Sequence, residues 1–265
     1  MRTRRLIAVA VTSSALVFPA YATAKPTITL SGSTSVAPLA SKLARGYVKK
    51  HKVQFKILQG GSDIGVSDVA HGRVTLGMSS RDPLPSDPGG LVFNRIARDG
   101  ICIATNSRNS ISGLSQAQVQ GIFSGRVRSW SQVPGAKISG TIDLIVRNAA
   151  SGTQDAFQNI FMGQNLRVSP SASQKPSNGR VQQSIASNKN AIGYVDFNFT
   201  SGLHTVPYKG VSCTLRNAKS GQYGGVRNFW LVSRGKPKGA AAGFLNWIKT
   251  SAARKIVGSN WVPLK

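Results

Sequence analysis

Strand-like and helix-like segments alternate along this chain, and the alternation constrains its fold more than any other feature. Residues 27–30 and 142–146 have the composition of short strands, whereas residues 38–50 carry Leu39, Leu43 and Tyr47 on one helical face. A helix that lies between two strands covers a face of the sheet and lets the strands pair in parallel. The sequence therefore predicts an α/β fold with mostly parallel sheets flanked by helices.

The other expected elements follow the same two periodicities. Further strands are expected at residues 53–57, 74–78, 100–105, 191–197 and 226–233. A helix is expected from Ser115, which forms a capping box with Gln118, to Gly125. Other helices are expected over residues 156–161, after a cap at Asn178, and over residues 244–256.

The first 24 residues have the composition of a secretory signal peptide. Arginines at positions 2, 4 and 5 precede an apolar stretch at residues 6–18, and Ala22 and Ala24 fit an A-x-A-like cleavage site. We expect cleavage near Ala24 and a mature protein that is periplasmic or secreted. No later apolar run is long enough to span a bilayer.

The charge of the chain restricts its partners. The sequence holds 34 Lys and Arg residues against 8 acidic residues, all of them Asp, for a formal net charge of +26. Such a chain attracts anions, whether small oxyanions, nucleic acid or anionic surface polymers, although the charge can also serve solubility alone. Aromatic residues do not interleave with the Lys and Arg residues, which disfavours nucleic acid.

Cysteine and histidine are too scarce to build a metal site. Cys102 and Cys213 can form a disulfide in an exported protein, or they can be two buried thiols. His51, His71 and His204 are scattered without metal-ligand spacing. We expect neither a metal nor a cofactor.

Three junctions between a strand and a helix are rich in Gly, Ser and Thr, at residues 31–35, 59–63 and 148–153. The first N–H groups of a helix lack intrahelical partners, and the helix dipole makes that end partly positive, so such junctions can bind anions. Arg147, at the end of one strand, can contact a tetrahedral oxyanion with two N–H groups. Each junction taken alone can also be an ordinary helix cap.

These junctions resemble those of the periplasmic phosphate-binding proteins of phosphate ABC transporters. The resemblance rests on "GSTSVAPLA" at 32–40, "QGGSDIGV" at 59–66, "GMSSRDPL" at 77–84, "VRNAASGTQDAF" at 146–157 and "AIGYVDF" at 191–197. It implies a monomer with a two-lobed type II binding-protein fold that closes over phosphate and hands it to an inner-membrane permease. It also implies one lobe of residues 25–105 and 226–265 and a second lobe of residues 106–225.

The resemblance also assigns phosphate-binding residues. Those that match the family's loops are Thr34, Ser35, Ser62, Arg147, Ser151, Gly152 and Thr153. Asp63 and Arg81 stand where this chain departs from the family pattern, and we include both in the expected site. Arg81 either binds the anion or pairs with Asp99.

Selectivity for phosphate requires an acceptor for its proton. Near pH 7 phosphate carries a proton and sulfate does not, so a carboxylate accepts a hydrogen bond from the first and repels the second. The candidate acceptors are Asp63, which we favour, Asp99 and Asp82. Without an acceptor, sulfate, arsenate or an organophosphate stays open as the ligand.

Two other classes of function were weighed against phosphate binding. A secreted hydrolase is disfavoured because the chain has neither a G-x-S-x-G motif nor clustered metal ligands, so we do not expect an enzyme. A protein of the same fold that acts as a sensory or adhesin-like binder of anionic surfaces would use the basic surface instead. The leading hypothesis is extracytoplasmic phosphate binding and delivery to an ABC-type permease.

Overall fold

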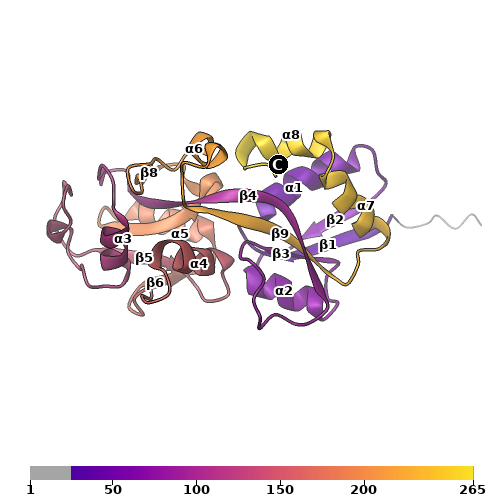
Figure 1. Ribbon diagram of the computed structural model, residues 1–265, viewed down its shortest axis with the longest axis horizontal. Coiled ribbons are helices and arrows are strands. Elements are labelled where there is room, and N and C mark those ends of the chain that lie inside the picture. Colours follow the sequence, from indigo (N-terminus) through magenta and orange to yellow (C-terminus); the bar gives the residue numbers. More distant parts are fainter. Residues whose placement is uncertain (1–24, 265) are drawn as a thin grey trace, which may run out of the picture.

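Two lobes lie side by side in this protein, joined by two long strands, β4 (Leu91–Asn106) and β9 (Val226–Arg234) (Figure 1). The structure is a computed structural model that describes residues 25–264. The expected signal peptide, residues 1–24, lies outside the described residues. Each lobe consists of strands covered by helices, so the predicted two-lobed α/β fold is confirmed.

The first lobe is built on β1, whose neighbours β2 and β3 both pair with it in parallel. Helices α1, α7 and α8 cover one face of these strands, and α2 covers the other (Figure 1). Ile28 and Leu30 of β1 are fully buried between these layers. The bounds are β1 Thr27–Gly32, β2 Gln54–Ile57, β3 Leu76–Ser79, α1 Ala37–Val48, α2 Ser62–Ala70, α7 Gly239–Ile248 and α8 Ser251–Asn260.

The second lobe is built in the same way on β5, which pairs in parallel with β6 and β7. Its core is aromatic, and Tyr194 stacks on Phe157 with ring centroids 4.0 Å apart. The bounds are β5 Asp143–Arg147, β6 Ser173–Lys175, β7 Ala191–Asp196, β8 Leu203–Thr205, α3 Gln116–Phe123, α4 Gly152–Phe157, α5 Asn178–Ser187 and α6 Leu215–Ser220. Helix α4 continues into a π-helical turn, Gln158–Met162.

The two long strands link the lobes into one nine-stranded sheet with the order β2-β1-β3-β9-β4-β7-β5-β6, and β8 pairs with β4. Every antiparallel pair involves β4 or β9, whereas the other strands pair in parallel. The sheet is therefore mixed. Strand β4 begins earlier than the expected strand at 100–105. Its first half was not predicted because it is only partly buried and lacks the apolar run of a core strand.

The hydrophobic cores show where β4 passes from one lobe to the other. Ile96 and Ala97 pack in the core of the first lobe, whereas Ile101 and Ile103 pack in the core of the second. The packing of β4 therefore changes from the core of one lobe to the core of the other near residues 98–100.

Local signals set several helix ends. The capping box of Ser115 and Gln118 is present at the start of α3, as predicted. The helix expected over 244–256 is two helices, because the side chain of Thr250 accepts a hydrogen bond from the Ala253 N–H and starts α8 anew. Ser177, rather than the predicted Asn178, caps α5.

A disulfide joins Cys102 of β4 to Cys213, a pairing that the sequence left open. It ties the crossing strand to the segment that precedes α6 across 111 residues of chain. Within residues 25–264, no helix has the length and apolar character that a membrane crossing requires.

Candidate anion-binding site

Four helix N-termini meet at the seam between the lobes. The starts of α1 and α2 come from the first lobe, and those of α4 and α5 come from the second. The backbone N–H of Asp63 donates to the Ala150 carbonyl across the seam at 3.2 Å. The three predicted junctions are thus brought together, and the start of α5 joins them.

A buried cluster of hydroxyl and amide groups bridges the seam. Ser35 Oγ lies 3.1 Å from Thr153 Oγ1 of the other lobe. Asn178 Nδ2 donates to Ser35 Oγ at 2.7 Å and to Thr34 Oγ1 at 3.2 Å. All four side chains are almost fully buried, so any ligand held here is withdrawn from water.

The N-terminal loops of α2 and α4 complete the cluster on one side. Ser62 Oγ accepts a hydrogen bond from the Ser80 N–H at 3.0 Å. A Cβ added at Gly152 would lie 2.3 Å from Ser62 Oγ, so only glycine permits this approach of the lobes. Ser151 caps α4 by accepting from the Thr153 N–H at 3.2 Å. The predicted Ser-Gly-Thr run is therefore both a helix cap and part of the seam.

Arg227, on the crossing strand β9, is a central cation of the cluster that the sequence did not single out. Its guanidinium donates to Thr153 Oγ1 at 2.7 Å and to Ser35 Oγ at 2.8 Å, and so reaches both lobes. It also pairs with Asp99 Oδ2 at 3.2 Å and lies 3.8 Å from Asp196 Oδ2. The sequence feature that could have pointed to Arg227 is its position as a lone arginine in an otherwise strand-like run, "GGVRNFW".

Asp99 and Asp196 form a fully buried pair of carboxyl groups beside Arg227. Burial raises the pKa of both groups, and the charge of Asp196 raises the pKa of Asp99 further, while Arg227 opposes the shift. Asp99 Oδ1 has no hydrogen-bond partner among the described residues. One guanidinium cannot neutralise two carboxylates, so the pair favours retention of a proton.

Arg147 is buried behind the start of α4, as expected for a residue at the end of β5. Its Nε donates to the Lys175 carbonyl at 3.2 Å and its Nη2 to the Pro176 carbonyl at 2.9 Å. Burial lowers the pKa of Arg147 to about 10, and the positive charge of Arg227 acts in the same direction. Two buried arginines near one another create a field that favours an anion.

The structure does not bring the Arg81 guanidinium into this cluster. Arg81 Nε lies 2.7 Å from Asp63 Oδ1, and Arg81 Nη2 lies 2.6 Å from Asp87 Oδ1. It therefore does not pair with Asp99, one of the two alternatives drawn from the sequence. The reason is local, because Asp87 follows in the same loop and also accepts the Leu84 N–H at 2.8 Å.

Two of the three candidate proton acceptors are engaged elsewhere. The favoured Asp63 pairs with Arg81, and its side chain is 44% exposed. Asp82 accepts hydrogen bonds from Asn228 Nδ2 at 2.9 Å and Trp230 Nε1 at 3.0 Å near the surface. Asp99 is the candidate that lies in the buried cluster.

A groove of about 250 Å³ at the mouth of the seam reaches Arg227 from solvent. Arg81 and Asp155 line it from opposite lobes, with Arg81 Nε 3.6 Å from Asp155 Oδ2. Burial raises the pKa of Asp155 to about 6, and the charge of Asp63 adds to the effect.

The arrangement is suited to holding a compact anion rather than to breaking a bond. Hydroxyls, an amide, helix N-termini and the Arg227 guanidinium converge on the seam, and residues 25–264 hold no group of three His, Cys or Asp residues that could bind a metal. Together with the two lobes, this defines an α/β binding protein with its site between the lobes.

The chain belongs to the PBP superfamily, since the model of the PBP superfamily domain matches residues 19–251. It is 25% identical over 253 residues to the phosphate-binding protein PstS of Bacillus subtilis, which covers 91% of this chain and 82% of that protein.

Solved structures agree with this assignment. A putative phosphate ABC transporter substrate-binding protein from Clostridium perfringens, with bound phosphate, is 28% identical and superposes with a TM-score of 0.84, over 90% of this chain and all of that one. An ABC-type phosphate transport receptor from Vibrio cholerae is 26% identical, with a TM-score of 0.73, over 89% of this chain and all of that one.

Proposed function

We propose that this protein binds inorganic phosphate between its lobes outside the cytoplasm and delivers it to an ABC-type permease. The observation that carries the proposal is the buried seam cluster, in which Arg227 donates to Ser35 and Thr153 from opposite lobes. The names of the similar proteins from Bacillus, Clostridium and Vibrio support phosphate as the anion.

The donors of the seam match what a tetrahedral oxyanion needs. Its oxygens would accept from the hydroxyls of Thr34, Ser35, Ser62 and Thr153, from Asn178 Nδ2, and from the N–H groups at the starts of α1 and α4. Arg147 and Arg227 would supply buried positive charge. Because water is excluded, each of these interactions is stronger than it would be at the surface.

Asp99 is our candidate for the group that selects phosphate over sulfate. In its ionised form the carboxylate would accept a hydrogen bond from the ligand's O–H group, and sulfate has no O–H group to donate one. Because the pKa of Asp99 is raised, the ligand and the carboxyl group would compete for one proton. Arg227, 3.2 Å away, opposes that shift and so favours the ionised carboxylate, which leaves the proton on the ligand.

Closure of the lobes would turn on the two crossing strands. We place the hinge near residues 98–100 of β4 and 226–228 of β9, where the packing changes from one core to the other. Residues 25–97 and 229–264 then form the first lobe, and residues 101–225 form the second. A hinge of this kind gives the permease two surfaces to distinguish, one for the open state and one for the closed state.

The signal peptide and the monomeric state that we expect fit an exported carrier of phosphate. A cleaved signal peptide at residues 1–24 would export the chain, and transport as a monomer would leave the seam accessible to ligand. We assign no enzymatic activity, because the proteins that this chain resembles are named as binding proteins.

Calorimetric titration of phosphate into the mature protein, stripped of ligand by unfolding and refolding, tests the proposal. We expect one-to-one binding that Arg147→Ala weakens by at least about a hundredfold, since a buried charged partner is lost. Arg126→Ala, which removes an exposed arginine of the second lobe, is the matched control and should bind as the wild type does. Absence of binding to the wild type, or equal binding by both variants, would contradict the proposal.

A further inference from the structure

One face of the first lobe carries many cations and no acidic residues. No acidic residue occurs between residues 25 and 62 or after Asp196, and these segments supply α1, α7 and α8. The acidic residues of the first lobe's surface lie in or near α2 and the 81–90 loop, on the other side of the sheet (Figure 1). Phosphate binding at the seam makes no use of this charge.

Two adjoining depressions on this face share Lys49 and together form what we call the basic track. One lies between α1 and α8, and the other lies below the end of α1. The cations of the basic track are Lys25, Lys42, Arg45, Lys49, Lys50, Lys52 and Lys255. Helices α1 and α8 lie against each other along the first depression (Figure 1).

These cations are not neutralised by the chain between residues 25 and 264. The salt bridges of that part involve Arg73, Arg81 and Arg227 as the cations. Lys42 donates to the neutral Asn260 Oδ1 at 2.7 Å and lies over the Trp261 ring at 5.2 Å, which orders the ammonium group without cancelling its charge. Like charges held this close repel one another, and a bound anion would relieve that repulsion.

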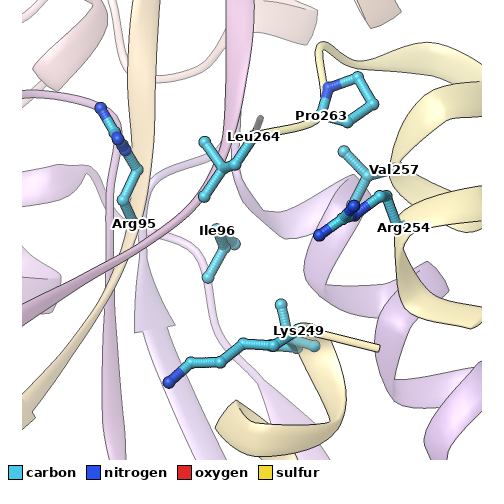
Figure 2. Close-up of a pocket in the computed structure, with 8 residues that line it drawn as sticks. Arg95, Ile96, Lys249, Arg254, Val257, Pro263 and Leu264 are labelled. Atoms are coloured by element: carbon cyan, nitrogen blue, oxygen red, sulfur yellow. The ribbon is translucent and has the colours of Figure 1, made fainter. Parts of the chain in front are cut away.

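The positive face continues beyond α8. Figure 2 shows a separate hollow of about 180 Å³, with Arg95 from β4, Lys249 from the end of α7 and Arg254 from α8 around it. Its floor is apolar and includes Ile96 and Val257. No acidic residue lines this hollow either, so α8 carries cations on both flanks.

We propose that the basic track binds a linear phosphate polymer without bases, for which inorganic polyphosphate is the probe. The cations are spread along an open groove instead of converging on one point, which suits a chain of charges better than a single ion.

The side chains beside the track favour this occupant over single-stranded nucleic acid and over a membrane surface. Base stacking by nucleic acid needs exposed aromatic rings, but Tyr47 and Trp261 are buried in the core beneath the track. Insertion into a membrane surface needs apolar side chains that project from the face, and among the described residues Val48 is the exposed large apolar side chain of the track.

The test compares two variants that change net charge equally. The track variant carries Arg45→Glu, Lys49→Glu and Lys255→Glu, and the control carries Arg126→Glu, Lys137→Glu and Lys189→Glu on the exposed surface of the second lobe. Binding of fluorescent polyphosphate is followed by anisotropy as a function of salt. Thermal unfolding of both variants confirms that they are folded.

We expect the wild type and the control to bind within about twofold of each other at roughly 0.15 M salt. The track variant should bind at least about tenfold more weakly, with a slope of log K against log salt that is shallower by about 2, because three phosphate contacts are lost. Equal weakening in both variants, or no wild-type binding at that salt, would overturn the inference.

An Arg147→Ala protein separates this inference from the proposed function. It should keep polyphosphate binding while losing phosphate from the seam, since Arg147 is buried at the end of β5 in the second lobe, whereas the track lies on the first lobe. Loss of polyphosphate binding in Arg147→Ala would show that the polymer enters the seam and would overturn the assignment to the track.

Discussion

Arg227 is the residue through which the lobes and the buried carboxyl groups interact. Its Nη1 donates to Thr153, and its Nη2 contacts both Ser35 and the carboxyl pair of Asp99 and Asp196. Its position on a crossing strand lets one side chain sense both lobes. Any change in the charge of the carboxyl pair is therefore transmitted to the ligand donors.

The substitution Asp99→Asn should change the selectivity for phosphate over sulfate and leave the fold largely intact. The carboxyl is fully buried with a raised pKa, so an uncharged isostere is tolerated, but it removes the ionised acceptor for the ligand's proton. We expect phosphate affinity to fall by at least about tenfold, about 1.4 kcal/mol, with sulfate affinity unchanged or higher. Paired calorimetric titrations check this. A parallel loss for both anions would assign Asp99 a structural role only.

Gly152→Ala should block closure of the lobes. The added Cβ would lie 2.3 Å from Ser62 Oγ and 2.8 Å from the Arg81 backbone nitrogen, both on the opposite lobe. We expect phosphate affinity to fall by at least about tenfold while each lobe stays folded, because the steric conflict exists only when the lobes meet.

Gly89→Ala is the matched control, since no atom lies within 4 Å of its added Cβ. Small-angle scattering with and without phosphate reports the closure. If Gly152→Ala compacts and binds like the control, the lobes do not close at this contact.

Among the elements, α4 carries a pH-dependent group at the mouth of the seam. Burial raises the pKa of Asp155 to about 6 from its ordinary 3.8, so the folded protein holds this proton over a pH range in which the unfolded chain has lost it. The stabilisation is full below about pH 4 and is lost as the pH rises through about 6.

Asp155→Asn should remove that dependence. The side chain is 33% exposed, so we expect a difference on the order of 1 kcal/mol between the wild type and the variant in how much stability is lost from about pH 4.5 to about pH 7. Urea unfolding at the two pH values measures it. Identical pH dependence in both proteins would show that solvent screens Asp155 fully.

The elements also show what sequence reasoning can reach. The junction loops and helix α3 were predictable because the relevant signals, Gly-Ser-Thr runs and a capping box, are local. The break before α8 was missed because the apolar pattern of two helices merges across Lys249 and Thr250. Thr250 is a helix cap within that apolar pattern, and it starts a new helix instead of continuing α7.

The candidate site was predictable only where a single loop carries its residues. Thr34, Ser35 and Thr153 follow from their junctions, whereas Arg227 and Asp99 lie 128 residues apart and meet because β4 and β9 pair. The pairing of Arg81 with Asp87 was not predicted either, because it depends on the shape of the loop that both residues share.

For the whole molecule, the disulfide between Cys102 and Cys213 should stabilise the second lobe in particular. It closes a loop over 111 residues of chain that contain most of that lobe, and so restricts the unfolded state there. Changing both cysteines to serine should lower the free energy of unfolding by about 2–4 kcal/mol. Denaturant unfolding under oxidising conditions, with chemically reduced wild type as a second comparison, checks this. An unchanged midpoint would contradict it.

The two lobes, the two crossing strands and the seam cluster together form one device for enclosing an anion. The nine-stranded sheet continues through both lobes, so motion of one lobe relative to the other must pass through β4 and β9. The basic track lies on the outer face of the first lobe and is independent of that motion.

Equilibrium dialysis of radiolabelled phosphate against the ligand-stripped mature protein, with sulfate in large excess, tests the central claim most directly. We predict one phosphate retained per chain in the presence of sulfate. A protein that retains no phosphate, or that releases its phosphate to the excess sulfate, would contradict the assignment of this seam as a phosphate site.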